Sequence, residues 1–395
     1  MKIQPNLIPR FNLDYNLGDL LFSLKSILWG SDLDFRTLEA QFERNIFFTS
    51  NGRATLYVIL KALNLPKKSK VGVPLYSCTV VFDAIINAGH VPCFIDIELD
   101  NYTLDPHDLE EKIEDLSAVV VIHTFGRPAD MDEINEIADG IPVIEDCAHS
   151  LLSEYKGRIT GTLGDASFFS FKKYISAGEG GMLILNDEKF IEDVQKEIGL
   201  LKEPTKINEI KHSFFTYIHS SLYHKPLYGL FAFPIGSYIN TNTNIKISTN
   251  GKFPITKIRK SDLGIFLKKL KGFREKVELQ RRNSWILIDE LESTSLVLPY
   301  EKEHTWCNYY LFPVRFRNKR ERDKAHELLR DFGVDSAKLY SKTPKEARKF
   351  YGYGRNCSNS ETIADTVLVV PNYYTLNEDE MMRVAESIKK VERLL

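Results

Sequence analysis

The residues that could do chemistry stand where two predicted buried strands end. Asp146 closes the apolar run 142–146, and the aromatic run 168–171 leads into Lys172, Lys173 and a glycine-rich turn at 178–181. A carboxylate at the end of a buried strand is costly unless a cation pairs with it. Two ordinary interpretations stay open: Asp146 could cap a following helix, and a lysine after a strand is usually a surface residue.

A third group completes the set. Residues 50–54 (Ser-Asn-Gly-Arg-Ala) open a predicted helix whose N-terminus could bind phosphate. Pyridoxal 5'-phosphate uses all three groups, because its aldehyde reacts with a lysine, its ring nitrogen needs a carboxylate, and its phosphate suits a helix N-terminus with hydroxyls. The residues therefore point to a pyridoxal-phosphate site.

The elements that must position these groups alternate between residues 46 and 190. Strand-like apolar runs alternate with amphipathic helical patterns, the strands at 71–75, 91–97, 118–125, 142–146 and 182–186, and the helices at 50–63, 80–89, 105–116 and 131–140. This alternation predicts an α/β fold with a mostly parallel sheet wrapped by helices. Ligands in such sheets bind at the carboxyl ends of the strands, where Asp146 and the lysines lie.

The second half of the chain has a different texture. Residues 200–260 are expected to be loop-rich, with an exposed polar loop at 240–251, and 261–291 is helical and lysine-rich. Strand, helix, strand and helix patterns then follow at 309–316, 319–332, 366–370 and 377–394. We predict a large domain with the N-terminal segment over 1–245, and connecting helices with a smaller α+β domain over 246–395.

Composition limits the function classes. The 395 residues carry 52 Lys and Arg against 54 Asp and Glu, a net charge of −2, so no global basic field exists to hold nucleic acid. Five cysteines without a C-x-x-C pair favour reduced thiols in a cytoplasmic protein and no metal site. We expect no signal peptide from the N-terminal residues.

The most apolar stretch, 214–236, contains His219, His224, Lys225 and Pro226, so it is a poor membrane-spanning helix. Buried packing is the expected role of its aromatic residues. A lid, a subunit interface and a peripheral membrane-surface contact remain open.

From about residue 35 to the end, the chain resembles the DegT/DnrJ/EryC1/StrS family of sugar aminotransferases. The motifs agree in order and context, at 50–56, 73–77, 84–96, 123–132, 143–150, 155–171, 357–371 and 376–380. The resemblance implies the type I pyridoxal-phosphate transferase fold and a homodimer.

The resemblance also implies site roles. Lys173 would be the Schiff-base lysine, Asp146 would hold the ring nitrogen, and His149 would lie near the ring oxygen. The phosphate would be bound by Ser170 and by the helix start at Gly52, Arg53 and Ala54.

Three departures from the family pattern stand out. Ile175 occupies the usual lysine position, so a two-residue deletion after Ser170 is needed to place Lys173, and Lys172 is the rival. Cys78 replaces the aromatic residue that stacks on the cofactor, and Lys257 replaces an asparagine that the neighbouring subunit lends to the phosphate.

The implied activity is transfer of an amino group from glutamate to a keto or aldehyde sugar, nucleotide-linked, for surface polysaccharide or lipopolysaccharide. Two alternatives remain. A dehydratase branch of the family replaces the lysine by histidine, which Lys173 speaks against. A non-catalytic binding or regulatory relative would explain the shortened 170–173 spacing and Cys78.

Overall fold

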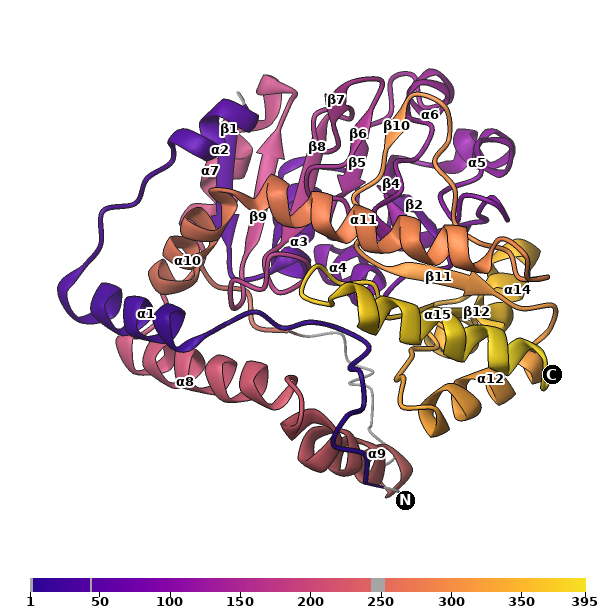
Figure 1. The fold of residues 1–395 in the computed structure, drawn as a ribbon. Coiled ribbons are helices and arrows are strands. Elements are labelled where there is room, and N and C mark those ends of the chain that lie inside the picture. The colour runs from indigo at the N-terminus through magenta and orange to yellow at the C-terminus, as the bar shows by residue number, and fades with distance from the viewer. Residues whose placement is uncertain (1–2, 43–44, 243–252) are drawn as a thin grey trace.

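The computed structural model describes residues 3–42, 45–242 and 253–395, and its centre is a seven-stranded sheet (Figure 1). The strand order is β1-β9-β8-β5-β4-β2-β3, and every neighbouring pair is parallel except the two that β9 makes with β1 and β8. The predicted mostly parallel sheet is confirmed. The strands are β1 Asn45–Thr49, β2 Lys70–Pro74, β3 Val91–Ile95, β4 Ala118–Ile122, β5 Val143–Asp146, β8 Ala166–Ser170 and β9 Gly181–Leu185.

Helices cover both faces of this sheet. Along β4, Ala118, Val120 and Ile122 pack with the helices of one face, whereas Val119 and Val121 pack with those of the other. A strand buried on both faces must be apolar throughout, which explains the continuous apolar run. One face carries α3 (Gly52–Ala62), α4 (Thr79–Ala88) and α7 (Ile191–Gly199), and the other carries α2 (Arg36–Gln41), α5 (Pro106–Lys112), α6 (Met131–Ile137) and α10 (Lys260–Leu270).

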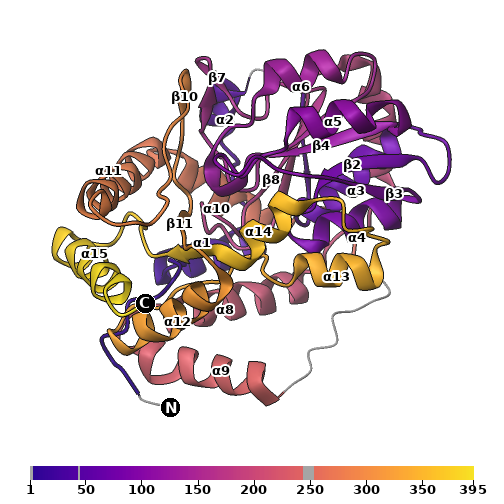
Figure 2. The ribbon, with the colours of Figure 1, turned by 90° about the vertical axis from the view of Figure 1, so that its right-hand side faces the viewer.

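A smaller α+β unit lies beside the sheet (Figure 2). Its antiparallel pair is β11 (Phe312–Arg315) and β12 (Val367–Val370), and its helices are α11 (Phe273–Leu291), α12 (Lys319–Asp331), α13 (Thr343–Phe350), α14 (Ser358–Thr366) and α15 (Glu378–Glu392). A third sheet joins β10 (Thr305–Trp306) to the hairpin β6 (Glu154–Tyr155) and β7 (Arg158–Ile159). The predicted domain boundary at 245/246 lies outside the described residues.

Two predicted elements are interrupted. The helical stretch 261–291 divides into α10 and α11 at Gly272, whose φ of 72° a side-chain-bearing residue would adopt only with strain. The predicted strand 118–125 ends at Ile122, and the short 3-10 turn η2 (Thr124–Gly126) follows. Phe125 has a φ of 62° in this turn.

The expectation of loops over 200–260 is wrong. The segment contains α8 (Lys206–Leu222), the π-helical turn η4 (Tyr228–Ala232) and α9 (Phe233–Asn242). Ser220 of α8 packs on the N-terminal segment, where its Oγ accepts from the Tyr15 N–H at 2.9 Å. Tertiary packing of this kind overrides weak local propensity. The predicted polar loop falls on 240–251, of which 240–242 end α9 and the remainder lies outside the described residues.

The expectation of buried packing over 214–236 is confirmed for Tyr228, which is 1% exposed, but it is wrong for several other large side chains. Phe214, Phe215, Ile218, Phe231 and Ile235 are exposed. The helix α8 runs beside the N-terminal helix α1 (Leu17–Trp29), and α8 and α9 lie along the lower side of the molecule in Figure 1. No helix of the described residues is long and apolar enough to cross a bilayer.

Candidate active site

A cavity of about 330 Å³ lies where β4, β5 and β8 end and α3 and α4 begin. Seven of the nine site residues predicted from sequence line it, and Ala54 and Lys257 do not. Residues as far as 121 positions apart in sequence, Gly52 and Lys173, meet there because parallel strands bring their carboxyl ends to one edge. The seven are Gly52, Arg53, Cys78, Asp146, His149, Ser170 and Lys173.

Asp146 is a buried carboxylate with few partners. Its Oδ1 accepts from the Ala148 N–H at 2.9 Å, and among the described residues no hydrogen bond to Oδ2 is found. Burial raises its pKa to about 6, against lowering contributions from the Ala148 N–H, Lys173 and His123. The residue caps a turn and not a helix, because a turn follows β5. A carboxylate in this state is suited to pairing with a cationic ring nitrogen.

The turn after β8 separates the two candidate lysines. Lys172 has a side chain that is 63% exposed, and its Nζ lies 3.8 Å from Glu179. The charge of Lys173 instead lowers the pKa of both Asp146 and His149. The fold thus brings Lys173, the lysine that spacing favours, into electrostatic contact with the site carboxylate.

His149 is held by groups that sequence reasoning missed. Its Nδ1 accepts from the Phe125 N–H at 3.3 Å, so the neutral ring carries its hydrogen on Nε2. Asn308 donates to the His149 carbonyl at 3.0 Å and to the Leu151 carbonyl at 2.9 Å. Burial, followed by the charge of Lys173, holds the pKa of His149 well below its usual range. His149 is therefore a neutral donor through Nε2.

Tyr340 enters the cavity from the smaller unit. Its hydroxyl lies 3.4 Å from His149 Nε2, and the two rings are parallel within 5° at 6.4 Å between centroids. Cys78, at the N-terminus of α4, lines the same cavity. Tyr340 therefore adds an aromatic ring to the cavity that Cys78 also lines. Nothing local in the sequence around residue 340 signals this, because the contact is entirely tertiary.

The start of α3 forms the end of the cavity that suits phosphate. A Cβ on Gly52 would lie 3.3 Å from the Phe169 carbonyl oxygen and 3.4 Å from the Ser170 Cβ, so the two chain segments approach closely. Asn51 caps the helix by accepting from the Ala54 N–H at 2.9 Å. The structure therefore leaves the predicted donor Ala54 without a free N–H, and Gly52, Arg53 and the Ser170 hydroxyl are the donors that remain.

Lys257 lies apart from the cavity in its own chain. Its Nζ pairs with Glu203 at 2.7 Å, and its backbone N–H donates to the Lys202 carbonyl. Its predicted contact with the phosphate of a neighbouring subunit stays a prediction.

A second cavity, of about 270 Å³, adjoins the first and shares Lys172 and Glu179 with it. Its other walls come from α8 and the N-terminal segment, including Tyr15, His212, Phe215 and His219. Ion pairs run between the cavities: Glu179 to Arg259 at 3.5 Å, Arg259 to Asp262 at 3.2 Å, and His212 to Asp262 at 3.3 Å. A larger open hollow of about 620 Å³, between 135–143 and 186–189, contains none of the predicted site residues.

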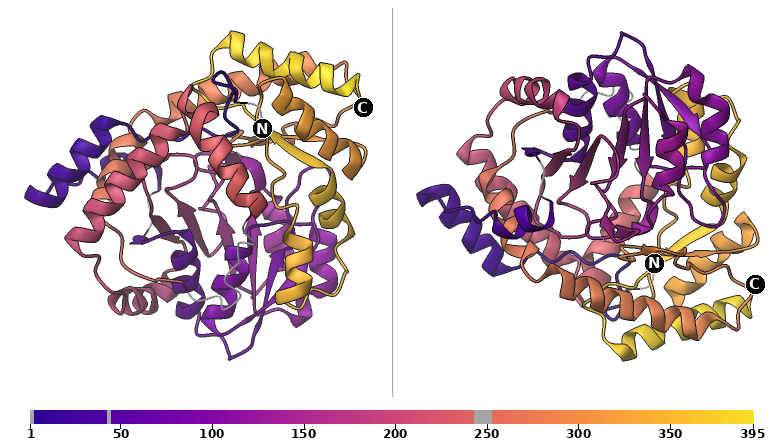
Figure 3. Two further views of the ribbon diagram at one scale, coloured as in Figure 1. Left: turned by 90° about the horizontal axis from the view of Figure 1, so that it is seen from below. Right: turned by 90° about the horizontal axis from the view of Figure 1, so that it is seen from above.

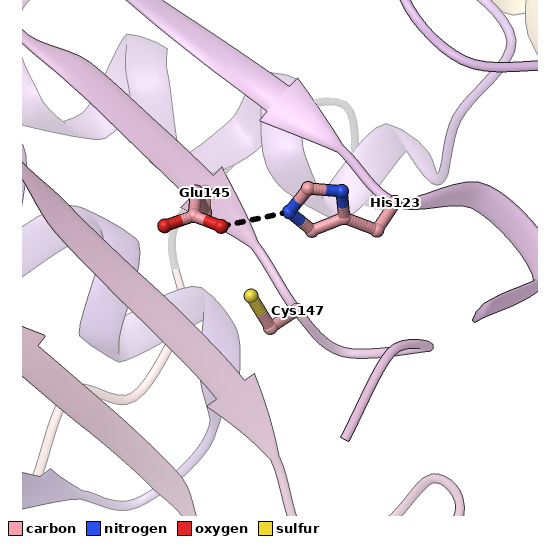
Figure 4. A group of neighbouring side chains, drawn as sticks. All are labelled: His123, Glu145 and Cys147. Carbon is pink, nitrogen blue, oxygen red and sulfur yellow. Dashed lines mark hydrogen bonds and ion pairs between the residues drawn. The ribbon is translucent and has the colours of Figure 1, made fainter. Parts of the chain in front are cut away.

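Directly behind Asp146, His123, Glu145 and Cys147 form a buried cluster (Figure 4). Glu145 accepts from the N–H groups of Gly161, Leu163 and Gly164 at 2.7–2.8 Å, and lies 2.9 Å from His123 Nε2. His123 Nδ1 accepts from the Ala129 N–H at 3.1 Å. The carboxylate and both ring nitrogens are engaged, so the cluster is built as a support for β5 and not as a metal centre.

The family model of the DegT/DnrJ/EryC1/StrS aminotransferase family matches residues 40–217 and 252–389. The chain belongs to this family. The predicted family is confirmed, and with it the predicted enzyme class, a pyridoxal-phosphate-dependent aminotransferase. The match omits 1–39 and 218–251, which include α1, the end of α8, η4 and α9.

Three proteins of known sequence are similar to this chain. The uncharacterized protein MJ1066 of Methanocaldococcus jannaschii is 28% identical over 353 residues, 86% of this chain and 83% of that protein. The GDP-perosamine synthase of Escherichia coli O157:H7 is 39% identical over 144 residues, 35% of this chain and 40% of the synthase. The GDP-perosamine synthase of Vibrio cholerae is 32% identical over 148 residues, 36% of this chain and 40% of the synthase.

Solved structures agree with the fold. The sugar aminotransferase CalS13 of Micromonospora echinospora has a TM-score of 0.76 at 18% identity, covering 97% of this chain and 100% of that one. A DegT DnrJ EryC1 StrS aminotransferase of Brucella abortus has a TM-score of 0.74 at 17% identity, covering 95% of each chain. The predicted type I transferase fold is confirmed.

Proposed function

We propose that this family member transfers an amino group from glutamate to a keto or aldehyde sugar, nucleotide-linked, with pyridoxal 5'-phosphate bound in the 330 Å³ cavity. The observation that carries the proposal is that a buried Asp146 with one hydrogen-bond donor and Lys173 line the same cavity. The similarity to two GDP-perosamine synthases supports a sugar acceptor. Lys173 argues against the dehydratase branch.

The cavity suits the cofactor at each end. Asp146 would pair with the ring nitrogen, the Nε2 hydrogen of His149 would donate to the ring oxygen, and Gly52, Arg53 and Ser170 would bind the phosphate. Pyridoxal phosphate, when bound, supplies an aldehyde for amines and a cationic ring that stabilises negative charge on the neighbouring carbon.

Lys173 would move the proton in this reaction. As a neutral amine, Lys173 could take a proton from the carbon that bears the transferred amino group and deliver it to the C4′ carbon of the cofactor, on the other side of the nitrogen. Asp146, as a carboxylate, keeps the ring nitrogen protonated and so keeps the ring a good acceptor of charge. His149 stays neutral and orients the ring through Nε2.

The 270 Å³ cavity is the proposed seat of the sugar acceptor, since it opens beside Lys172 and Glu179 at the edge of the first cavity. Its aromatic wall suits a planar ring such as a nucleobase. Further parts of the proposal are a cytoplasmic homodimer, with Lys257 reaching a neighbouring site, and a product used in surface polysaccharide or lipopolysaccharide.

The test begins with the absorbance spectrum of the purified protein with pyridoxal phosphate, before and after borohydride, followed by peptide mapping. We expect a yellow protein, bleached by borohydride, with the label on Lys173. Glutamate should convert the chromophore and release 2-oxoglutarate in a single turnover before any sugar is added.

The outcomes separate the alternatives. A colourless protein that takes up no pyridoxal phosphate would favour the non-catalytic relative. Label on Lys172 would mean that the deletion lies one residue away. A yellow protein whose chromophore glutamate does not convert would overturn glutamate as the donor.

A further inference from the structure

The outer layer, defined as α1, α8 and η4 with α9, covers the lower side of the molecule (Figure 1; Figure 3, left). Most of it comes from the two segments that the family model does not match, 1–39 and 218–251. The segments are joined to each other: the Ser220 hydroxyl donates to the Leu13 carbonyl at 2.6 Å, and α1 packs on α8. Most of this layer therefore lies outside the residues that the family model matches, although the first part of α8 lies inside them.

The first helix of the layer has a second apolar face. Leu20, Ser23 and Ile27 are buried against the protein. On the other side, Leu17, Leu21 and Leu28 lie in one stripe at a spacing of four and seven residues, with Lys25 between them, and all are exposed. Trp29, 79% exposed, ends the helix. A water-facing helix would place polar residues here.

The helix α8 repeats the pattern. Its buried side consists of Glu209, Ser213 and Ser220. Its exposed stripe is Ile207, Lys211, Phe214, Phe215 and Ile218, at spacings that place all five on one face. Phe231 and Ile235 add exposed apolar side chains farther along. Stripes of this size mark interaction surfaces.

On α1 and α8 the acidic side chains face the protein and the lysines face outward. Asp19, the one acidic residue of α1, is 1% exposed and pairs with Lys268 and Lys269 at 3.1 Å. Glu209, the one acidic residue of α8, is buried and accepts from Ser261. The charged residues left facing outward on these helices are lysines, among them Lys25 and Lys211 in the middle of the stripes.

We infer that the outer layer docks on an anionic lipid bilayer, with the Leu, Phe, Ile and Trp side chains in the headgroup region and the lysines against the lipid phosphates. Exposed apolar stripes with an aromatic end residue are typical of interfacial helices, and outward-facing lysines beside them attract anionic lipids. At 13 and 17 residues, α1 and α8 are too short to span. A second copy fits less well, since an isologous contact would face lysine stripes with lysine stripes and offer no carboxylate from either helix.

Docking in this orientation has a structural consequence. Phe215 belongs both to the exposed stripe and to the wall of the 270 Å³ cavity. The bilayer would lie beside the mouth of that cavity. Membrane docking is nevertheless independent of the chemistry in the cofactor cavity, so each can fail without the other.

The test is flotation of the full-length protein, loaded with pyridoxal phosphate, with vesicles of phosphatidylcholine alone or mixed with phosphatidylglycerol. We expect binding to the mixed vesicles that weakens as salt is added. The paired change Leu21→Gln with Phe214→Gln should lower the partition coefficient about tenfold or more. Lys25→Gln and Lys211→Gln should lower it about fivefold each.

Matched controls use exposed residues on other faces. Leu279→Gln on α11 and Lys67→Gln before β2 should leave vesicle binding unchanged. Unfolding midpoints and the cofactor spectrum show whether each variant is folded. The proposal is overturned if the wild type fails to float with anionic vesicles. It is also overturned if light scattering finds a dimer that the stripe variants dissociate, because a second copy then covers the layer.

Discussion

Two neighbouring carboxylates at the end of β5 are treated in opposite ways by the fold. Glu145 faces a closed cluster and accepts from three backbone N–H groups, with His123 2.9 Å away. Asp146 faces the cavity and has one backbone donor, and burial raises its pKa to about 6. Successive side chains of a strand point to opposite faces. Two consecutive residues therefore lie in different surroundings, one with its hydrogen-bonding capacity filled by the protein and one with capacity left for a ligand.

The difference shows what each carboxylate is for. A buried charge whose hydrogen-bonding capacity is filled by the protein has nothing left to offer a ligand. A buried charge with unused capacity is destabilising until a cation arrives, and such groups cluster at functional sites. The predictions below test this contrast, from the largest expected effect to the smallest.

Substitution of Lys173, the amine in the cavity with Asp146, should have the largest effect. Lys173→Ala removes the proposed proton carrier, so the rate of transamination with glutamate should fall by about 10³-fold. Lys172→Ala is the matched control, because its exposed side chain should leave the glutamate half-reaction within a few-fold of wild type. If Lys172→Ala were inactive with glutamate while Lys173→Ala remained active, Lys172 would be the proton carrier instead of Lys173.

Substitution of Glu145, in the closed cluster, should lower the stability of the protein. Glu145→Gln places an amide against backbone N–H groups that already need an acceptor, and should lower the free energy of unfolding by about 3–5 kcal/mol. Urea unfolding measures this, with the exposed Glu136→Gln expected within about 0.5 kcal/mol of wild type. A stable but inactive Glu145→Gln would mean that this carboxylate also acts on the ligand.

Asp146→Asn should have the opposite effect to Glu145→Gln, because it should raise the stability of the cofactor-free protein at pH 7. The folded pKa of about 6 lies above the ordinary 3.8, so between these values the folded protein binds more protons than the unfolded chain, and stability falls as pH rises through this window. At pH 7 the cofactor-free variant should therefore be more stable than wild type by on the order of 2–3 kcal/mol. It should also bind pyridoxal phosphate more weakly.

Urea unfolding of the cofactor-free proteins from pH 4 to pH 7 measures this effect as the difference between variant and wild type. Comparison by difference removes the contribution of other carboxyl groups with raised pKa values, such as Asp83 and Asp335. A variant that loses stability at pH 7 would show that Asp146 is already satisfied, and the contrast with Glu145 would collapse.

The smallest effect belongs to Tyr340. Tyr340→Phe removes a hydroxyl 3.4 Å from His149 Nε2 but keeps the ring, so catalysis should change by less than about tenfold. Tyr340→Ala should weaken cofactor binding further if the ring compensates for Cys78. If Tyr340→Phe and Tyr340→Ala gave equal cofactor spectra and equal dissociation constants for pyridoxal phosphate, the Tyr340 ring would have no role in binding the cofactor.

Much of the site was predictable because its residues mark strand ends. Asp146, Ser170 and Lys173 end or follow apolar runs. The alternation of these runs with helices predicts a parallel sheet, which brings the three residues to one edge. The helices over 206–242 were missed because serines and aromatic residues give a weak local signal, and packing on the N-terminal segment decides their fold. Ala54 was predicted as a donor without regard to Asn51, whose side chain captures its N–H.

The sequence alone therefore determined the family, the sheet, and the order in which a carboxylate, a serine and a lysine reach one edge, since these follow from periodicity and motif. Only the tertiary structure decided that Tyr340 lines the site and Asn308 holds His149. It also decided that the hydrogen-bonding capacity of Glu145 is filled and that of Asp146 is not, and that Phe214 and Phe215 of α8 face outward. These depend on contacts between distant residues, and the free energy of a contact or of burial is set by neighbours that the local sequence does not contain.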